Sequence, residues 1–156
     1  MTEKTINVLV IEPGKVPYEK QIPDTLEAKQ QIVGGYIEAL YPYDDMVALV
    51  CNEEGKLTGQ PLNRALLDEN KKLYDIIAGT FFICGLSEDD FASLPPDMME
   101  KYKHKFLFPE KFMRDAVTEE IKILRETGPG IIRQIREAKQ QKLQAPGKPS
   151  EPEPEL

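Results

Sequence analysis

Short apolar runs separated by turn residues predict β-strands in the first half of the chain. The run "INVLVI" is followed by Pro13 and Gly14, which favour a turn, and "VPYEKQI" then alternates apolar and polar positions. These two segments are expected to form a hairpin. "YIEALYP" and "MVALVC" have the same character and are joined by a polar link of hairpin length, so a second pair of strands is expected there.

One helix is expected between these two pairs of strands. Asp24 and Glu27 have the spacing of a capping box, which favours a helix start. Gly34 and Gly35 follow "TLEAKQQIV", at the place where a left-handed glycine would end a helix. The spacing predicts a helix of about two to three turns.

The segment "LYDIIAGTFFICGL" is the most apolar part of the chain. An apolar run on both faces favours one central strand, although a buried helix fits the same run. Gly79 inside it indicates a bulge or a close approach of two backbones.

Beyond this segment the pattern favours helices. "SEDDFASL" predicts a short capped helix that Pro95 and Pro96 close. From Pro109 onward, apolar residues fall at spacings of four, four and three, as on one face of a helix that docks on the sheet. Those residues are Met113, Val117, Ile121 and Leu124. After Gly128-Pro129-Gly130, "IIRQIREAKQQKLQ" predicts a basic amphipathic helix that projects from the body.

These elements predict an α+β fold, a small mixed or mainly antiparallel sheet covered by helices, with a C-terminal helical extension. Residues 1–127 are expected to form a single globular domain and residues 128–143 the basic helix. Residues 144–156 alternate proline with glutamate and have almost no apolar side chains. They are expected to form a disordered tail, because they cannot bury enough surface to offset the entropy of ordering.

The distribution of charge narrows the range of partners. The chain of 156 residues has a net charge of -7, which disfavours direct binding of nucleic acid. Residues 1–109 have eleven Lys and Arg against eighteen Asp and Glu, whereas residues 110–142 have eight against six. The opposite signs favour a monomer with the basic helix folded back, or a weak and salt-sensitive homo-oligomer.

Two further features concern the cellular setting. The N-terminus lacks the pattern of a signal peptide and no apolar run is long enough to cross a membrane, so a cytoplasmic protein without membrane contact is expected. Cys51 and Cys84 lie in apolar runs without CxxC spacing. They are expected to be buried, reduced thiols, and a disulfide between adjacent strands is the less favoured alternative.

The main candidate site is the polar connection "CNEEGKLTGQPLNRAL". Its first half is typical of a hairpin turn with Gly55 at positive φ, which requires no function. Its second half is longer than a turn needs. The Asn63 amide and the Arg64 guanidinium, together with the Lys56 ammonium, can bind a phosphate or a carboxylate. Tyr36 either follows a helix C-cap or stacks on a flat ligand. The candidate ligand-binding residues are Tyr36, Asn52, Lys56, Asn63 and Arg64.

Patterns for catalysis and metal binding are weak. His104, the only histidine, lies in the charged segment "KYKHKF", where an ordinary exposed imidazole is expected. The sequence contains no P-loop, nucleophile elbow or dinucleotide-binding glycine pattern. Asp44-Asp45 and Glu53-Glu54 are adjacent carboxylates, whose side chains point apart in a strand or turn. No catalytic residue, metal or cofactor is predicted, and an enzyme of unrecognised chemistry is the least favoured class.

Taken in order, "VLVIEPGKVPY", "VGGYIEALYP", "VALVCNEEGKL" and "YDIIAGTFFICG" resemble a family of small domains of unknown function found in phages and integrative elements of gut Firmicutes, over roughly residues 6–112. The resemblance implies an accessory or host-interaction role. The sequence therefore favours a non-catalytic binding protein of a phage or mobile element, an accessory or counter-defence factor that acts on a host protein. The alternative is a protein that binds or sequesters a nucleotide or another small anionic ligand.

Overall fold

The computed structural model of the chain describes residues 4–68, 70–88 and 90–144. Its central feature is a sheet in which every strand pairing is antiparallel, with the order β2-β1-β7-β4-β3 and a short strand, β8, beside β7. The strands of this sheet are β1 (Thr5–Ile11), β2 (Tyr18–Pro23), β3 (Ile37–Leu40), β4 (Val47–Asn52), β7 (Phe81–Leu86) and β8 (Phe91–Ala92). Both predicted strand pairs, β1–β2 and β3–β4, are confirmed.

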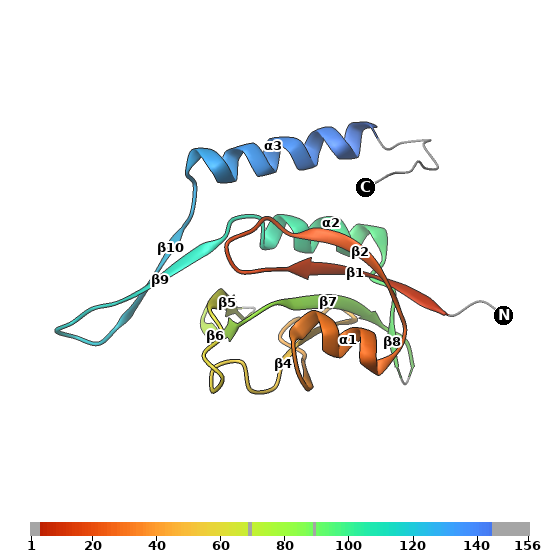
Figure 1. Ribbon diagram of the computed structural model, residues 1–156, viewed down its shortest axis with the longest axis horizontal. Coiled ribbons are helices and arrows are strands. Elements are labelled where there is room, and N and C mark those ends of the chain that lie inside the picture. Colours follow the sequence, from red (N-terminus) through yellow and green to blue (C-terminus); the bar gives the residue numbers. More distant parts are fainter. Residues whose placement is uncertain (1–3, 69, 89, 145–156) are drawn as a thin grey trace.

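Within the described residues, three helices and two separate ribbons complete the fold (Figure 1). The helices are α1 (Leu26–Val33), α2 (Pro96–Lys105) and α3 (Pro129–Gln144). The ribbons consist of β5 (Leu62–Leu67) with β6 (Leu73–Ala78), and of β9 (Glu110–Arg114) with β10 (Ile121–Arg125). The fold is α+β and mainly antiparallel. Among the described residues, no helix has the length and apolar character needed to span a membrane.

The central strands are buried on both faces, which explains their unbroken apolar sequence. Phe81 and Phe82 are both fully buried and belong to two different hydrophobic clusters, since successive side chains of a strand point to opposite faces. Tyr102 of α2 belongs to the first cluster and Val33 of α1 to the second. The two helices therefore cover opposite faces of the sheet, and Figure 1 shows them on either side of β7.

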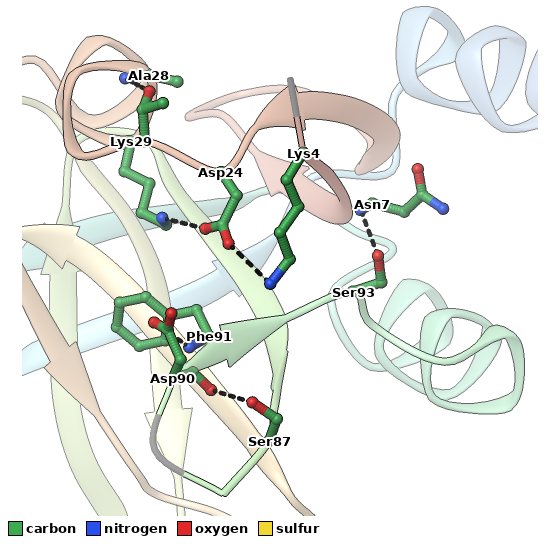
Figure 2. A network of polar contacts seen from close by, with 10 residues as sticks. Lys4, Asn7, Asp24, Ala28, Lys29, Ser87, Asp90, Phe91 and Ser93 are labelled. Atoms are coloured by element: carbon green, nitrogen blue, oxygen red, sulfur yellow. Dashed lines mark hydrogen bonds and ion pairs between the residues drawn. The ribbon is translucent and has the colours of Figure 1, made fainter. Parts of the chain in front are cut away.

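Helix α1 has the predicted position but a different N-cap. Thr25, not Asp24, caps it, because the Thr25 Oγ1 atom accepts a hydrogen bond from the Ala28 N–H at 3.1 Å. Asp24 instead accepts a hydrogen bond from Lys29 Nζ at 2.7 Å, and the side chains of both residues are nearly buried (Figure 2). The predicted glycine C-cap is confirmed, since Gly34 is left-handed with φ of 79°.

The prediction of one central strand over "LYDIIAGTFFICGL" is wrong. Gly79, with φ of 82°, turns the chain, so that the first half becomes β6 and pairs with β5 while the second half becomes β7. The expected close approach at Gly79 does occur, because an added Cβ would overlap the Gln60 side-chain amide. A continuous apolar run did not reveal the turn, since the residues on both sides of it, from Ile76 to Ala78 and from Phe81 onward, are buried.

The two helices predicted between residues 87 and 127 are also wrong. In "SEDDFASL", Ser87 N donates to Asp90 O at 2.9 Å, and Phe91 and Ala92 form β8 in place of a helix. The helical stripe expected after Pro109 is the β9–β10 ribbon. Asp115 Oδ1 accepts hydrogen bonds from the N–H groups of Val117 and Thr118, which closes a turn in place of a helix. Met113, Val117, Ile121 and Leu124 are all exposed and none docks on the sheet.

The C-terminal helix is confirmed as α3 (Figure 1). It lies outside the two helix layers, and the Gln134 side chain joins it to the turn between β1 and β2 by accepting a hydrogen bond from Val16 N at 3.1 Å. The predicted disordered tail lies outside the described residues, except for Gln144 at the end of α3.

Candidate functional site

A cleft of about 290 Å³ lies where the loop after β4 passes over β6. Its walls come from β3, β4, β6 and the loop itself, and its lining includes Asn52, Lys56 and Leu57 from the predicted polar connection. The cleft also contains residues that are distant in sequence, Glu38 of β3 and Asp75 of β6. The fold therefore builds a concave surface from the first half of the predicted site.

A glycine brings the loop against the β5–β6 ribbon. A Cβ on Gly55 would lie 2.7 Å from the Ala78 carbonyl oxygen, so a larger residue would push the loop away from β6. Gly55 does not have a positive φ and β4 does not pair with β5, so the predicted hairpin turn is wrong at this point. The left-handed residue of the loop is Gly59, with φ of 78°.

Asn52 fixes the start of the loop. Its Oδ1 atom accepts a hydrogen bond from Glu54 N at 2.7 Å, and its Nδ2 atom donates to the Val33 carbonyl at 3.1 Å. The side chain thus links the loop to the end of α1. Although Asn52 lines the cleft, it holds the cleft's shape through both ends of its amide.

Acidic groups dominate the lining of the cleft. Glu38, Glu53 and Glu54 are exposed carboxylates, and Asp75 is a half-buried one. The single basic side chain, Lys56, forms an ion pair with Asp75 at 2.7 Å. The surplus of carboxylates gives the cleft a negative potential, which attracts cations and repels the anionic ligand that the sequence suggested.

Cys51 lines the cleft as a buried thiol. It is 4% exposed, and burial, together with the nearby carboxylates of Glu38 and Asp75, raises the pKa of its thiol to about 12. Burial likewise raises the pKa of the Cys84 thiol to about 12. Both cysteines are free and buried, as predicted, and they belong to the two different hydrophobic clusters.

Asn63 and Arg64 do not belong to the cleft. Both are 0% exposed, because they form part of β5, not of a loop. The Asn63 Nδ2 atom donates to the carbonyls of Ile11 at 2.9 Å and Gly79 at 2.8 Å. A side chain that is fully buried and bonded to its own protein cannot contact a ligand in this conformation, so the expectation that residues 52–64 form one surface site is wrong.

The guanidinium of Arg64 connects three distant segments. It donates to the carbonyls of Lys15 at 2.7 Å and Phe106 at 3.0 Å, and to Asn63 Oδ1 at 2.8 Å. Burial lowers the pKa of Arg64 to about 10, and the carboxylates of Glu110 and Glu126 oppose this shift. The side chain therefore remains charged at neutral pH, held mainly by carbonyl dipoles.

Tyr36 adjoins the cleft without lining it. Its carbonyl accepts a hydrogen bond from Glu53 N at 2.9 Å, and its side chain is 71% exposed. His104 is exposed on α2 and lies outside the lining. Within the part of the chain that the structure describes, no group of three or more His, Cys, Asp and Glu side chains could hold a metal ion. Of the five predicted residues, the structure brings Asn52, Lys56 and Tyr36 to one region.

A comparison with models of protein families identifies the family of the chain. The model of the domain of unknown function DUF3846 matches residues 6–107, about two thirds of the chain. The chain belongs to the DUF3846 family. We call residues 6–107 the family domain; they include the sheet, α1, α2 and the whole cleft. Ribbon β9–β10 and helix α3 lie beyond the match. No curated protein and no solved structure is similar to the chain.

Proposed function

We propose that the family domain is a non-catalytic module that binds a basic segment of another protein at the acidic cleft. The observation that carries this proposal is the charge of the lining, in which four carboxylates accompany one lysine. Because Lys56 already pairs with Asp75, the carboxylates of Glu38, Glu53 and Glu54 are the groups left to meet a cationic partner.

Apolar side chains beside these carboxylates support a protein partner. Leu57 lines the cleft and is 85% exposed, and Tyr36 adjoins it. Lys and Arg side chains place long aliphatic stems on apolar surface while their charged ends reach polar groups. An exposed tyrosine and leucine within a rim of carboxylates match that chemistry better than they match a phosphate.

We also propose the finer role suggested by the sequence: an accessory or counter-defence factor of a phage or mobile element that acts on a host protein in the cytoplasm. Its support is the family resemblance together with the excess of acidic residues, which allows a surface to occupy a basic site on a host protein. The alternative of a nucleotide or other anionic ligand has less support, because Asn63 and Arg64 are buried and the cleft is acidic.

Titration calorimetry with two synthetic peptides tests the proposal. One peptide is rich in Lys and Arg and carries a single aromatic residue; the other has glutamate at every basic position. We expect the basic peptide to bind at low salt and the acidic one not to bind. Replacing Glu53 and Glu54 with lysine should weaken binding by roughly tenfold or more, because two attractive charges become repulsive.

The matched control makes the same change of charge elsewhere. Glu119 and Glu120 are also adjacent and exposed, but lie at the tip of the β9–β10 ribbon. Their double replacement with lysine should leave peptide binding nearly unchanged. An equal loss in both variants would show that only the net charge matters, and binding of nucleotides in place of the basic peptide would contradict the proposal.

A further inference from the structure

Residues 110–144, which we call the arm, contact the family domain mainly where β9 lies beside β5. At the base of the arm, Glu110 Oε1 accepts a hydrogen bond from Ala65 N at 2.9 Å. Farther along, Gln134 accepts the hydrogen bond from Val16 N described above. Figure 1 shows the ribbon extending away from the sheet and α3 lying outside the helix layers.

The arm exposes apolar side chains on both faces of its ribbon. The pairing of β9 with β10 places Ile121 and Ile123 on one face, and Met113 and Leu124 on the other. All four are exposed, and Val117 at the tip is 89% exposed. A two-stranded ribbon without cover is marginally stable in water, so these residues indicate a surface that another protein covers.

We propose that a second copy of this chain covers the arm, with the arm of each copy lying on the family domain of the other. The inference is separate from the proposed function, because it uses residues 110–144 and not the cleft.

The size of the arm favours a reciprocal contact. A helix of 16 residues spans about 24 Å and a strand of 5 residues about 17 Å, so the arm is roughly 40 Å long and about 10 Å wide. One arm would cover roughly 400 Å² and bury about 800 Å² in total, which is below the ~1,000 Å² of a specific interface. Two arms exchanged between two copies would bury about 1,600 Å², the usual size of a stable interface.

The charges are also complementary between two copies. The chain up to residue 109 has seven more acidic than basic residues, whereas residues 110–142 have two more basic than acidic ones. Arg133 and Arg136 of α3 are exposed. In an exchanged dimer each basic helix meets an acidic domain, and the contact should weaken as salt screens it.

Sedimentation equilibrium of the full chain tests the dimer. We expect a reversible dimer whose dissociation constant rises roughly tenfold between about 0.05 M and about 0.5 M salt. The double variant Ile123→Thr with Ile132→Gln keeps β-propensity in the ribbon and removes apolar surface from both halves of the arm. It should weaken the dimer by roughly tenfold or more, whereas Leu26→Gln, which changes an exposed leucine of α1, should not.

Crosslinking then shows where the arm lies. A Val117→Cys variant has one accessible thiol, since Cys51 and Cys84 are buried. With a thiol-to-amine reagent and a mixture of isotopically labelled and unlabelled chains, we expect links from residue 117 to lysines of the family domain of the other chain. A monomer at every concentration, links only within one chain, or a dimer insensitive to the arm variants would overturn the inference. In each case the peptide assay on the cleft still reports separately on the proposed function.

Discussion

The family domain and the arm are built in different ways. In the domain, residues distant in sequence satisfy one another, as when the buried Arg64 in β5 donates to the carbonyls of Lys15 and Phe106. Apart from the bonds that join Glu110 and Gln134 to the domain, the arm is held by local bonds, as when Asp115 closes the turn of the ribbon. Burial therefore holds the domain together, whereas turn chemistry and helix propensity shape the arm without giving it a core.

The largest expected effect is on the free energy of unfolding, and it differs between an arginine of the domain and one of the arm. Arg64→Ala should lower the free energy of unfolding by about 3 to 5 kcal/mol, because it leaves buried carbonyls without their donor and opens a cavity. Arg133→Ala, at an exposed position of α3, should change it by less than about 0.5 kcal/mol. Urea denaturation of the two variants measures both values.

An additional variant separates charge from geometry at this position. Arg64→Lys keeps the charge but cannot form the same fork of hydrogen bonds, so it should lose most of what Arg64→Ala loses. Stability equal to that of the original chain in either Arg64 variant would show that the three segments do not depend on this side chain.

Two glycines, one in the domain and one in the arm, should give the next largest difference in unfolding free energy. A Cβ on Gly85 of β7 would overlap the Ser93 carbonyl oxygen, so Gly85→Ala should cost about 3 kcal/mol. A Cβ on Gly130 of α3 would meet no atom within 4 Å. Gly130→Ala should leave the unfolding of the domain unchanged within about 0.5 kcal/mol, although it favours the helix itself. Thermal and urea unfolding of both variants test this. Equal losses of stability in the two variants would contradict the difference in packing between the domain and the arm.

The smallest of these effects depends on pH. The hydrogen bond from Lys29 holds the pKa of Asp24 below its usual value, with Lys4 adding to this shift. Because the folded pKa lies below the unfolded one, the stabilisation is present above the unfolded pKa of about 4 and is lost as the pH falls through the folded value. Asp24→Asn should cost about 2 kcal/mol at neutral pH.

Unfolding measured at several pH values tests the contribution of the Asp24 charge. The difference in unfolding free energy between the original chain and Asp24→Asn should narrow in acid, as the carboxylate of Asp24 becomes protonated. Glu137 is an exposed residue of α3. The unfolding free energy of Glu137→Gln should stay within about 0.5 kcal/mol of that of the original chain at every pH. A difference for Asp24→Asn that is constant with pH would show that the ion pair with Lys29 does not contribute through its charge.

The elements that sequence reasoning found have strong local signals. Pro13 and Gly14 mark the first hairpin, Gly34 ends α1, and Pro129 begins α3. The elements that sequence reasoning missed lie where local signals for different secondary structures compete. Pro96 at the first turn of α2 is a favourable helix start that was interpreted only as an end. The stripe from Met113 to Leu124 has helical spacing by coincidence, and the side-chain turn at Asp115 overrides it.

Only the part of the candidate site that lies on one continuous loop could be predicted from the sequence. Asn52 and Lys56 lie on the loop and were found from its polar composition. Glu38 and Asp75 line the same cleft, but strands β3 and β6 bring them there through tertiary contacts that leave no pattern in the sequence. Arg64 was predicted to bind anions because its neighbours in sequence are polar. Its burial in β5 depends on the carbonyls of Lys15 and Phe106, which are distant in sequence and leave no local pattern.

The most direct test of the contrast between domain and arm is hydrogen exchange of the full chain at low and high protein concentration. The amides of β4 and β7 should exchange only through global unfolding at both concentrations, because these strands form the buried centre of the sheet. The amides of β9, β10 and α3 should exchange much faster when dilute and gain protection when concentrated. Arm amides that match β7 in dilute solution, or whose exchange does not change with concentration, would contradict the claim that the arm is completed by a second copy.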